Sequence, residues 1–191
     1  MMRILLLTGN PKKDGLCKSI ADAIIRGATD AGADVTQMST EKISRCRVCG
    51  DGWGTCASGR SCAFGDDGFN DIQAQIGNAD AFVIITPVYW GEVEESLKSF
   101  LDKIRRCENA FLPKPTPAKF LGKPVLLVAS PGGSGDGALS CLTELERFCQ
   151  HVGASVFDFI GVNRWNSDYK REAAYAAGKA LGSGRDIGKT V

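Results

Sequence analysis

Four cysteines gathered in one short stretch are the residues of this chain best suited to chemistry. They are spaced C-x2-C-x6-C-x5-C, whereas the other four of the eight cysteines are scattered along the chain. Grouped thiolates bind iron–sulfur clusters or zinc, and the same thiols can also remain free or pair as disulfides. The spacing alone leaves these outcomes open for Cys46, Cys49, Cys56 and Cys62.

A second candidate site follows the first apolar run of the chain. Residues 4–7 are Ile-Leu-Leu-Leu, a pattern typical of a parallel strand buried on both faces. The small and polar residues 8–15 come next, and a helical pattern begins near Cys17. Unpaired loop amides and the positive end of a helix dipole favour an anion, to which Lys12 or Lys13 adds a charge. The stretch therefore predicts an anion-binding loop.

Two further loops of the same character follow later apolar runs. Thr-Pro-Val-Tyr-Trp-Gly at 86–91 comes after the run 81–85, and Ser-Pro-Gly-Gly-Ser-Gly at 130–135 comes after the run 125–129. The carboxyl ends of parallel strands meet at one edge of a sheet, where ligands bind at the switch point of strand order. We expect the three loops to lie side by side, one at a phosphate and two along something flat.

The elements that must position these loops alternate between strand and helix. Such alternation predicts a parallel sheet with helices on both faces, a three-layer sandwich. Five strands of this length fit the order 2-1-3-4-5. The predicted strands are 4–7, 35–38, 81–85, 125–129 and 156–162, and the predicted helices are 17–32, 69–77, 93–104, 139–152 and 169–181.

Length and composition indicate one ordinary globular domain. The 191 residues form a single domain in our interpretation, with residues 44–70 as a cysteine-rich insert loop. A net charge of +1 gives no reason to propose nucleic acid or an anionic membrane as a partner. The N-terminus lacks a signal-peptide pattern, and no apolar run is long enough to cross a bilayer. We expect a cytoplasmic protein, since the thiols are clustered rather than spread as a disulfide framework.

Three other nucleotide or signalling motifs fit poorly. The first loop lacks the Gly-Lys-Ser/Thr ending of a P-loop. A receiver domain needs acidic residues where Thr8-Gly9 and Thr86-Pro87 stand. Residues 133–138 match G-x-G-x-x-A, but they follow a later strand rather than the first, so a flexible glycine turn is the better interpretation.

The three loops together resemble those of the flavodoxin-like NAD(P)H-dependent FMN reductase family. The first loop is similar to the family's G-S-P-R-x-x-G-N-T/S phosphate loop, with Leu16 and Cys17 as departures, and residues 86–102 are close to the family pattern. The resemblance covers about residues 3–162 and implies no catalytic side chain, because the flavin performs the chemistry. The FMN-binding residues that it implies are Asn10, Lys12, Gly15, Leu16, Cys17, Ser19, Thr86, Pro87, Val88, Tyr89, Trp90, Gly91, Ser130, Gly132 and Gly133.

The cysteine-rich insert resembles that of the iron–sulfur flavoproteins of the same family. Asp66-Asp67-Gly68-Phe69 matches the flank that follows the cysteine motif in those proteins. Gly52 occupies the third cysteine slot of their C-x2-C-x2-C spacing, and Cys56 follows it. The resemblance implies a [4Fe-4S] cluster on the four thiols, with zinc or no metal as alternatives.

The resemblance implies an FMN-binding oxidoreductase that uses NAD(P)H and reduces flavin, a quinone or a similar acceptor. The alternatives are an iron–sulfur flavoprotein that carries electrons between ferredoxin-like partners, or a non-catalytic flavin carrier. The resemblance also implies a homodimer or homotetramer, with the cysteine-rich loop and the 107–122 connection as the candidate interface.

Overall fold

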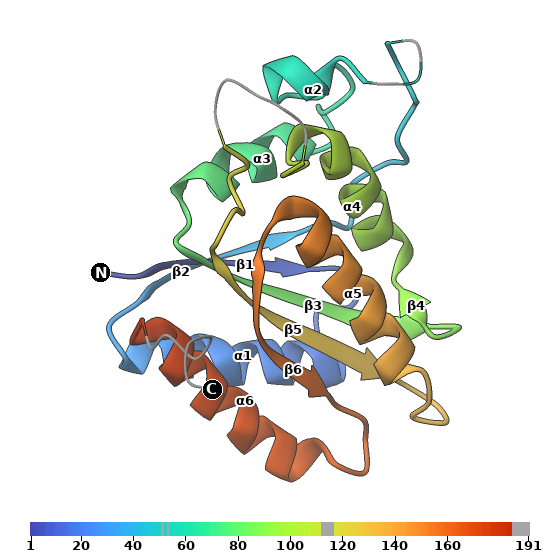
Figure 1. The fold of residues 1–191 in the computed structure, drawn as a ribbon. Coiled ribbons are helices and arrows are strands. Elements are labelled where there is room, and N and C mark those ends of the chain that lie inside the picture. Colours follow the sequence, from blue (N-terminus) through green and yellow to red (C-terminus); the bar gives the residue numbers. More distant parts are fainter. Residues whose placement is uncertain (51, 53, 112–116, 185–191) are drawn as a thin grey trace.

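A twisted parallel sheet forms the middle layer of the molecule (Figure 1). The computed structural model describes residues 1–50, 52, 54–111 and 117–184. The strand order is β2-β1-β3-β5-β6, and all four neighbouring pairs on this path are parallel. This confirms the predicted order, because the extra strand β4 is a two-residue return that pairs antiparallel with β3. The bounds are β1 Arg3–Thr8, β2 Asp34–Ser39, β3 Ala81–Tyr89, β4 Glu92–Val93, β5 Pro124–Pro131 and β6 Ser155–Gly161.

Helices cover both faces of the sheet (Figure 1). Helices α1 and α6 pack on one face, and α3, α4 and α5 pack on the other, while the short α2 lies in the cysteine-rich insert. Successive residues of a strand point to opposite faces, so Leu6 joins the core under α1 and Leu7 joins the core under α4. The bounds are α1 Gly15–Asp30, α2 Cys56–Gly59, α3 Phe69–Asn78, α4 Glu95–Cys107, α5 Ala138–Val152 and α6 Ser167–Gly182.

Most element ends lie within a few residues of the predicted ones, and three differences matter for the sites. Strand β3 continues through Thr86 to Tyr89, because its ladder with β5 extends to the pair Val88 and Pro131. Helix α4 begins at Glu95, since Val93 is taken up by β4. The insert, predicted as a loop, contains the helix α2.

Two predicted connecting segments cannot be compared with the structure in full. The prolines at 113 and 115 and the glycine-rich tail beyond 184 lie outside the described residues. Within the described helices, none is long and apolar enough to span a membrane.

Candidate functional site

An open cleft lies at the carboxyl edge of the sheet, where the three predicted loops meet. It has two parts, of about 590 Å³ and about 280 Å³. Both parts are lined by Val88, Tyr89, Pro131, Gly132 and Gly133, so they form one continuous space. The sequence-based expectation that these loops lie side by side is therefore confirmed.

The smaller part of the cleft is built on the first loop. The Asn10 side chain organises this loop, because its amide donates to the Lys12 carbonyl at 2.7 Å and accepts from the Lys12 N–H at 3.3 Å. Asp14 precedes α1 without a capping hydrogen bond from its side chain. The first amides of α1 are thus available to an anion, and the exposed Lys12 lines the same space.

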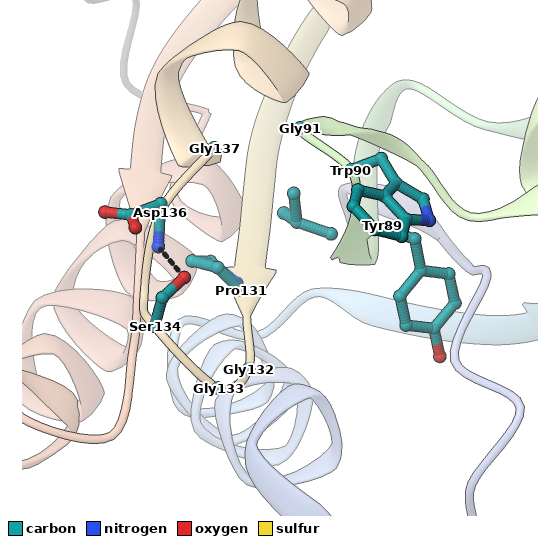
Figure 2. A pocket seen from close by; sticks show the side chains of 10 residues that line it. Tyr89, Trp90, Gly91, Pro131, Gly132, Gly133, Ser134, Asp136 and Gly137 are labelled. Atoms are coloured by element: carbon teal, nitrogen blue, oxygen red, sulfur yellow. Dashed lines mark hydrogen bonds between the residues drawn. The ribbon is translucent and has the colours of Figure 1, made fainter.

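Two aromatic side chains form one wall of the larger part. Figure 2 shows the rings of Tyr89 and Trp90 on the side of the cleft opposite the 131–137 turn. Trp90 is fully exposed, at 101%, and its backbone has a φ of 56°, in the left-handed region. This backbone conformation is strained for a bulky residue, and the exposed Trp90 side chain has no core packing that offsets the strain. We therefore assign Trp90 to the site.

The opposite wall is a glycine-rich turn after β5. The N–H of Gly135 donates to the Gly132 carbonyl at 2.7 Å, which closes the turn. Beta-carbons on Gly132 and Gly133 would meet no atom within 4 Å, so the backbone of this wall is open to a ligand. The Ser140 hydroxyl donates to the Gly91 carbonyl at 2.7 Å and to the Gly137 carbonyl at 3.0 Å. The two walls are therefore tied together at the closed end of the cleft.

A buried polar network behind the cleft fixes the first two loops relative to each other. One Glu94 carboxylate oxygen accepts from the N–H groups of Ser96 and Leu97, at 3.0 and 3.1 Å, which caps α4. The Glu94 N–H donates to the Thr86 hydroxyl at 3.1 Å. A β-carbon on Gly9 would lie 3.0 Å from that carboxylate oxygen and 2.8 Å from the Leu97 β-carbon. Glycine at position 9 lets the first loop lie directly against α4.

The structure distributes the predicted FMN-binding residues over three places. Ser19 and Thr86 do not line either part of the cleft within the described chain, because each hydroxyl is bonded elsewhere: Ser19 donates to the Leu16 carbonyl and Thr86 to the Pro87 carbonyl. Trp90 and Gly91 line the larger part. Val88, Tyr89, Gly132 and Gly133 line both parts. The predicted residues that line only the smaller part are Asn10, Lys12, Gly15, Leu16, Cys17, Pro87 and Ser130. Burial raises the pKa of the Cys17 thiol to about 11.

The cleft contains one cation that the sequence patterns did not indicate. Arg164 lies in the turn after β6 and lines the smaller part with Lys12. Its guanidinium also stacks over the Trp165 ring, 4.4 Å from the ring centroid. The turn is shaped by Asn163, whose side-chain oxygen accepts from two backbone N–H groups at 3.0 and 3.1 Å. The sequence signal that could have indicated Arg164 was an arginine just after the last predicted strand, because that strand ends at the same carboxyl edge of the sheet as the cleft.

The four clustered cysteines line a second, smaller pocket beside α4. Cys46, Cys49, Cys56 and Cys62 all line this pocket. Four cations line it as well: Arg47, Lys103, Arg105 and Arg106. Four thiolates would repel one another strongly without opposite charges nearby. The donor set and its charge surroundings therefore fit a group that binds several thiolates.

The individual thiols differ in their surroundings. Hydrogen bonds from the Thr55 backbone N–H and side chain lower the pKa of Cys49, and the Cys49 sulfur lies 3.6 Å from the Thr55 hydroxyl. Burial raises the pKa of Cys62, opposed by the Phe64 N–H and by Lys103. Among the described residues, no three His, Cys, Asp or Glu side chains are close enough to hold one metal ion.

A family model described as NADPH-dependent FMN reductase matches residues 2–163. An iron–sulfur flavoprotein of Archaeoglobus fulgidus is 28% identical over 105 residues, which are 54% of this chain and 46% of the relative. An iron–sulfur flavoprotein of Methanosarcina thermophila is 29% identical over 104 residues, 53% of this chain and 52% of the relative. The matched segment thus spans about half the length of these curated relatives.

Solved structures share the fold at low sequence identity. An NAD(P)H:quinone oxidoreductase from Methanothermobacter marburgensis superposes with a TM-score of 0.72 at 16% identity, over 94% of this chain and 96% of that one. A flavone reductase gives a TM-score of 0.72 at 16% identity, over 95% of this chain and 62% of that one. A flavodoxin from the domain Archaea gives 0.61 at 14% identity, over 96% of this chain and 98% of that one. These likenesses confirm the flavodoxin-like fold.

Proposed function

The chain belongs to the NADPH-dependent FMN reductase family, and on that premise we propose that it is an FMN-binding oxidoreductase that uses NAD(P)H to reduce flavin, a quinone or a similar acceptor. The single observation that supports this most is the continuous cleft, with an anion-binding loop at one end and an aromatic wall facing an open glycine turn at the other. Its two parts match a ligand that has a phosphate and a flat ring system.

The residues present fit FMN. Lys12, Arg164 and the first amides of α1 would hold the phosphate, because they combine positive charge with free N–H donors. Tyr89 and the open backbone at Gly132 and Gly133 would hold the ring from opposite sides. FMN, when bound, supplies the site that accepts a hydride and releases electrons. The protein's own work is to bind, orient and expose that group, and we assign no catalytic side chain.

The experiment that tests this function is anaerobic stopped-flow mixing with NADH and with NADPH. An oxidoreductase bleaches the flavin absorbance within one turnover time, and the faster cofactor identifies the donor. The alternative is a non-catalytic flavin carrier. In that case NADH and NADPH bleach the flavin absorbance far more slowly than a reduced ferredoxin transfers electrons to the flavin. Slow bleaching by both nicotinamide cofactors would contradict the enzyme proposal.

A second candidate feature is a [4Fe-4S] cluster on the four thiols. The shared pocket, its four cations and the iron–sulfur flavoprotein relatives support it. Such a site would add one-electron exchange with a ferredoxin-like partner. Iron and acid-labile sulfide in anaerobically purified protein test it. We expect Cys62→Ser to lose both, while Cys149→Ala, a change in the buried core of α5, keeps them.

Zinc binding and free thiols are the competing outcomes of the same measurement. Zinc without sulfide would identify a structural zinc site. Absence of both iron and zinc would identify free thiols.

We also propose a homodimer or homotetramer. The exposed Phe111 and Leu121, at 76% and 52%, lie within the 107–122 connection and support an interface there. Light scattering of the purified protein gives the assembly mass.

A further inference from the structure

One lysine of α4 is buried beside the thiol pocket. Lys103 is only 3% exposed, yet it lines the pocket formed around the four clustered cysteines. Its ammonium donates to a carboxylate oxygen of Asp67 at 2.5 Å and to the Phe64 carbonyl at 3.2 Å. A lysine is rarely buried this fully unless its charge is paired. The bonds to Asp67 and Phe64 are therefore part of the site.

The carboxylate that pairs with Lys103 is itself firmly held. The same Asp67 oxygen accepts from the Ser44 N–H at 2.8 Å and from the Ser44 hydroxyl at 2.7 Å, and the other oxygen accepts from the Phe69 N–H at 3.2 Å. Burial alone would raise the pKa of Asp67, but the bonds from Lys103, Ser44 and Phe69 outweigh it and lower the pKa to about 2. Asp67 does not line the thiol pocket, whereas Lys103 does. The positive member of the pair is therefore the one on the thiol side.

Lys103 is also connected to one of the thiols through the backbone. The Phe64 N–H donates to the Cys62 sulfur at 3.4 Å, and Lys103 holds the carbonyl of the same Phe64. The Phe64 ring is covered by the Arg47 guanidinium, 4.6 Å from its centroid. Lys103 thus fixes the segment that places Cys62.

Burial makes this charge count more than those of the other pocket cations. Arg47 is exposed, and Arg105 and Arg106 are half-buried. A charge that is kept away from water acts through a lower effective dielectric and is screened less by salt. Reduction of a thiolate-bound cluster adds one negative charge to the pocket, so the reduced form gains more from Lys103 than the oxidised form.

We propose that Lys103 is a positioning residue of the thiol site, which raises the reduction potential of the bound cluster and fixes Cys62. This inference rests on the proposed iron–sulfur cluster. Lys103→Met alone would remove the only cation paired with the half-buried Asp67 carboxylate within the described residues, so the main test is the double variant Lys103→Met with Asp67→Asn. The matched control is Lys98→Met on the same helix, since Lys98 is 44% exposed and forms an ordinary surface pair with Asp102.

The measurement is a redox titration of the reconstituted protein, followed by electron paramagnetic resonance, with dithionite as the donor of the single electron. We expect the double variant to keep its iron and sulfide but to lose at least tenfold in the equilibrium constant for one-electron reduction, a negative shift of about 59 mV. Lys103→Arg, which keeps the charge, should stay within threefold of the wild type, and Lys98→Met should not change. If the double variant does not fold, Lys103→Gln with Asp67→Asn retains a hydrogen-bonding pair and should show the same shift.

Failure of the two proposals can be told apart. A wild-type protein that takes up no iron and sulfide overturns the cluster and this inference with it, without affecting the FMN proposal. A loaded wild type whose neutral double variant titrates at an unchanged potential leaves the cluster in place and overturns the role of Lys103.

Discussion

Gly91 and Gly137 touch backbone to backbone at the closed end of the cleft. A β-carbon on Gly137 would lie 2.7 Å from the α-carbon of Gly91, and Gly137 has a φ of 84°, which side chains rarely adopt. The Ser140 hydroxyl bonds to the carbonyls of both glycines. The distance between the aromatic wall and the glycine wall therefore depends on the absence of one methyl group.

We expect Gly137→Ala to widen the cleft and weaken binding. The strained φ and the overlap together should lower the free energy of unfolding by about 2 kcal/mol and the affinity for FMN at least tenfold. Gly122→Ala is the matched control, because Gly122 has a φ of 71° but a β-carbon there would meet nothing within 4 Å. It should lose about 1 kcal/mol without any change in FMN affinity. Equal FMN affinity in the Gly137 variant would show that this contact does not shape the site.

Trp90→Gly should separate stability from binding. Trp90 is fully exposed with a φ of 56°, so glycine removes strain and loses no buried surface. We expect the free energy of unfolding to stay the same or rise by about 1 kcal/mol. The affinity for FMN or the acceptor should fall roughly two- to tenfold, because the variant loses one aromatic ring that can stack on the ligand. Tyr169→Ala, at another exposed aromatic residue on α6, should change neither binding constant.

Gly178→Ala tests the close packing of α1 against α6. A β-carbon on Gly178 would lie 2.2 Å from the Ile24 carbonyl oxygen, which is backbone and cannot move aside. Despite the higher helix propensity of alanine, we expect the free energy of unfolding to fall by about 1–3 kcal/mol in urea titrations. Gly77→Ala on α3 meets only the flexible end of Lys119, at 3.4 Å, and should be neutral or stabilising. A neutral Gly178 variant would contradict the packing described.

Acid should destabilise the insert through Asp67. Its pKa is about 2 in the folded protein, below the value of about 3.9 in an unfolded chain. The stabilisation is therefore fully present above about pH 4 and is lost as the pH falls towards 2. Urea unfolding at a series of pH values should show a steeper decline for the wild type than for Asp67→Asn. Parallel curves for the two proteins would show that Asp67 is not paired as described.

The order of the sheet could be predicted because its central strands are continuous apolar runs. Residues 4–7, 81–85 and 125–129 are buried on both faces, and the small residues after them marked the loops. The two-residue strand β4 could not be predicted, since no pattern is visible in Glu92 and Val93 alone. Its existence depends on the turn at Trp90 and Gly91, which returns the chain along β3.

The site could be predicted in outline but not in its individual contacts. The family resemblance implied Asn10 as an FMN-binding residue, and the structure adds that its side chain shapes the first loop. Arg164 was missed because no local pattern shows that the turn after β6 reaches the cleft. Three of the four cations around the thiols were missed for the same reason, because Lys103, Arg105 and Arg106 lie on α4, far along the chain from the cysteines.

The most direct test of the account is titration of the flavin-free protein with FMN, followed by flavin fluorescence. We expect saturable binding of one FMN per chain, weakened at least tenfold by Gly137→Ala and unchanged by Gly122→Ala. A protein that takes up no FMN, or binds it equally well in both variants, would contradict the claim that the two walls of this cleft hold the flavin.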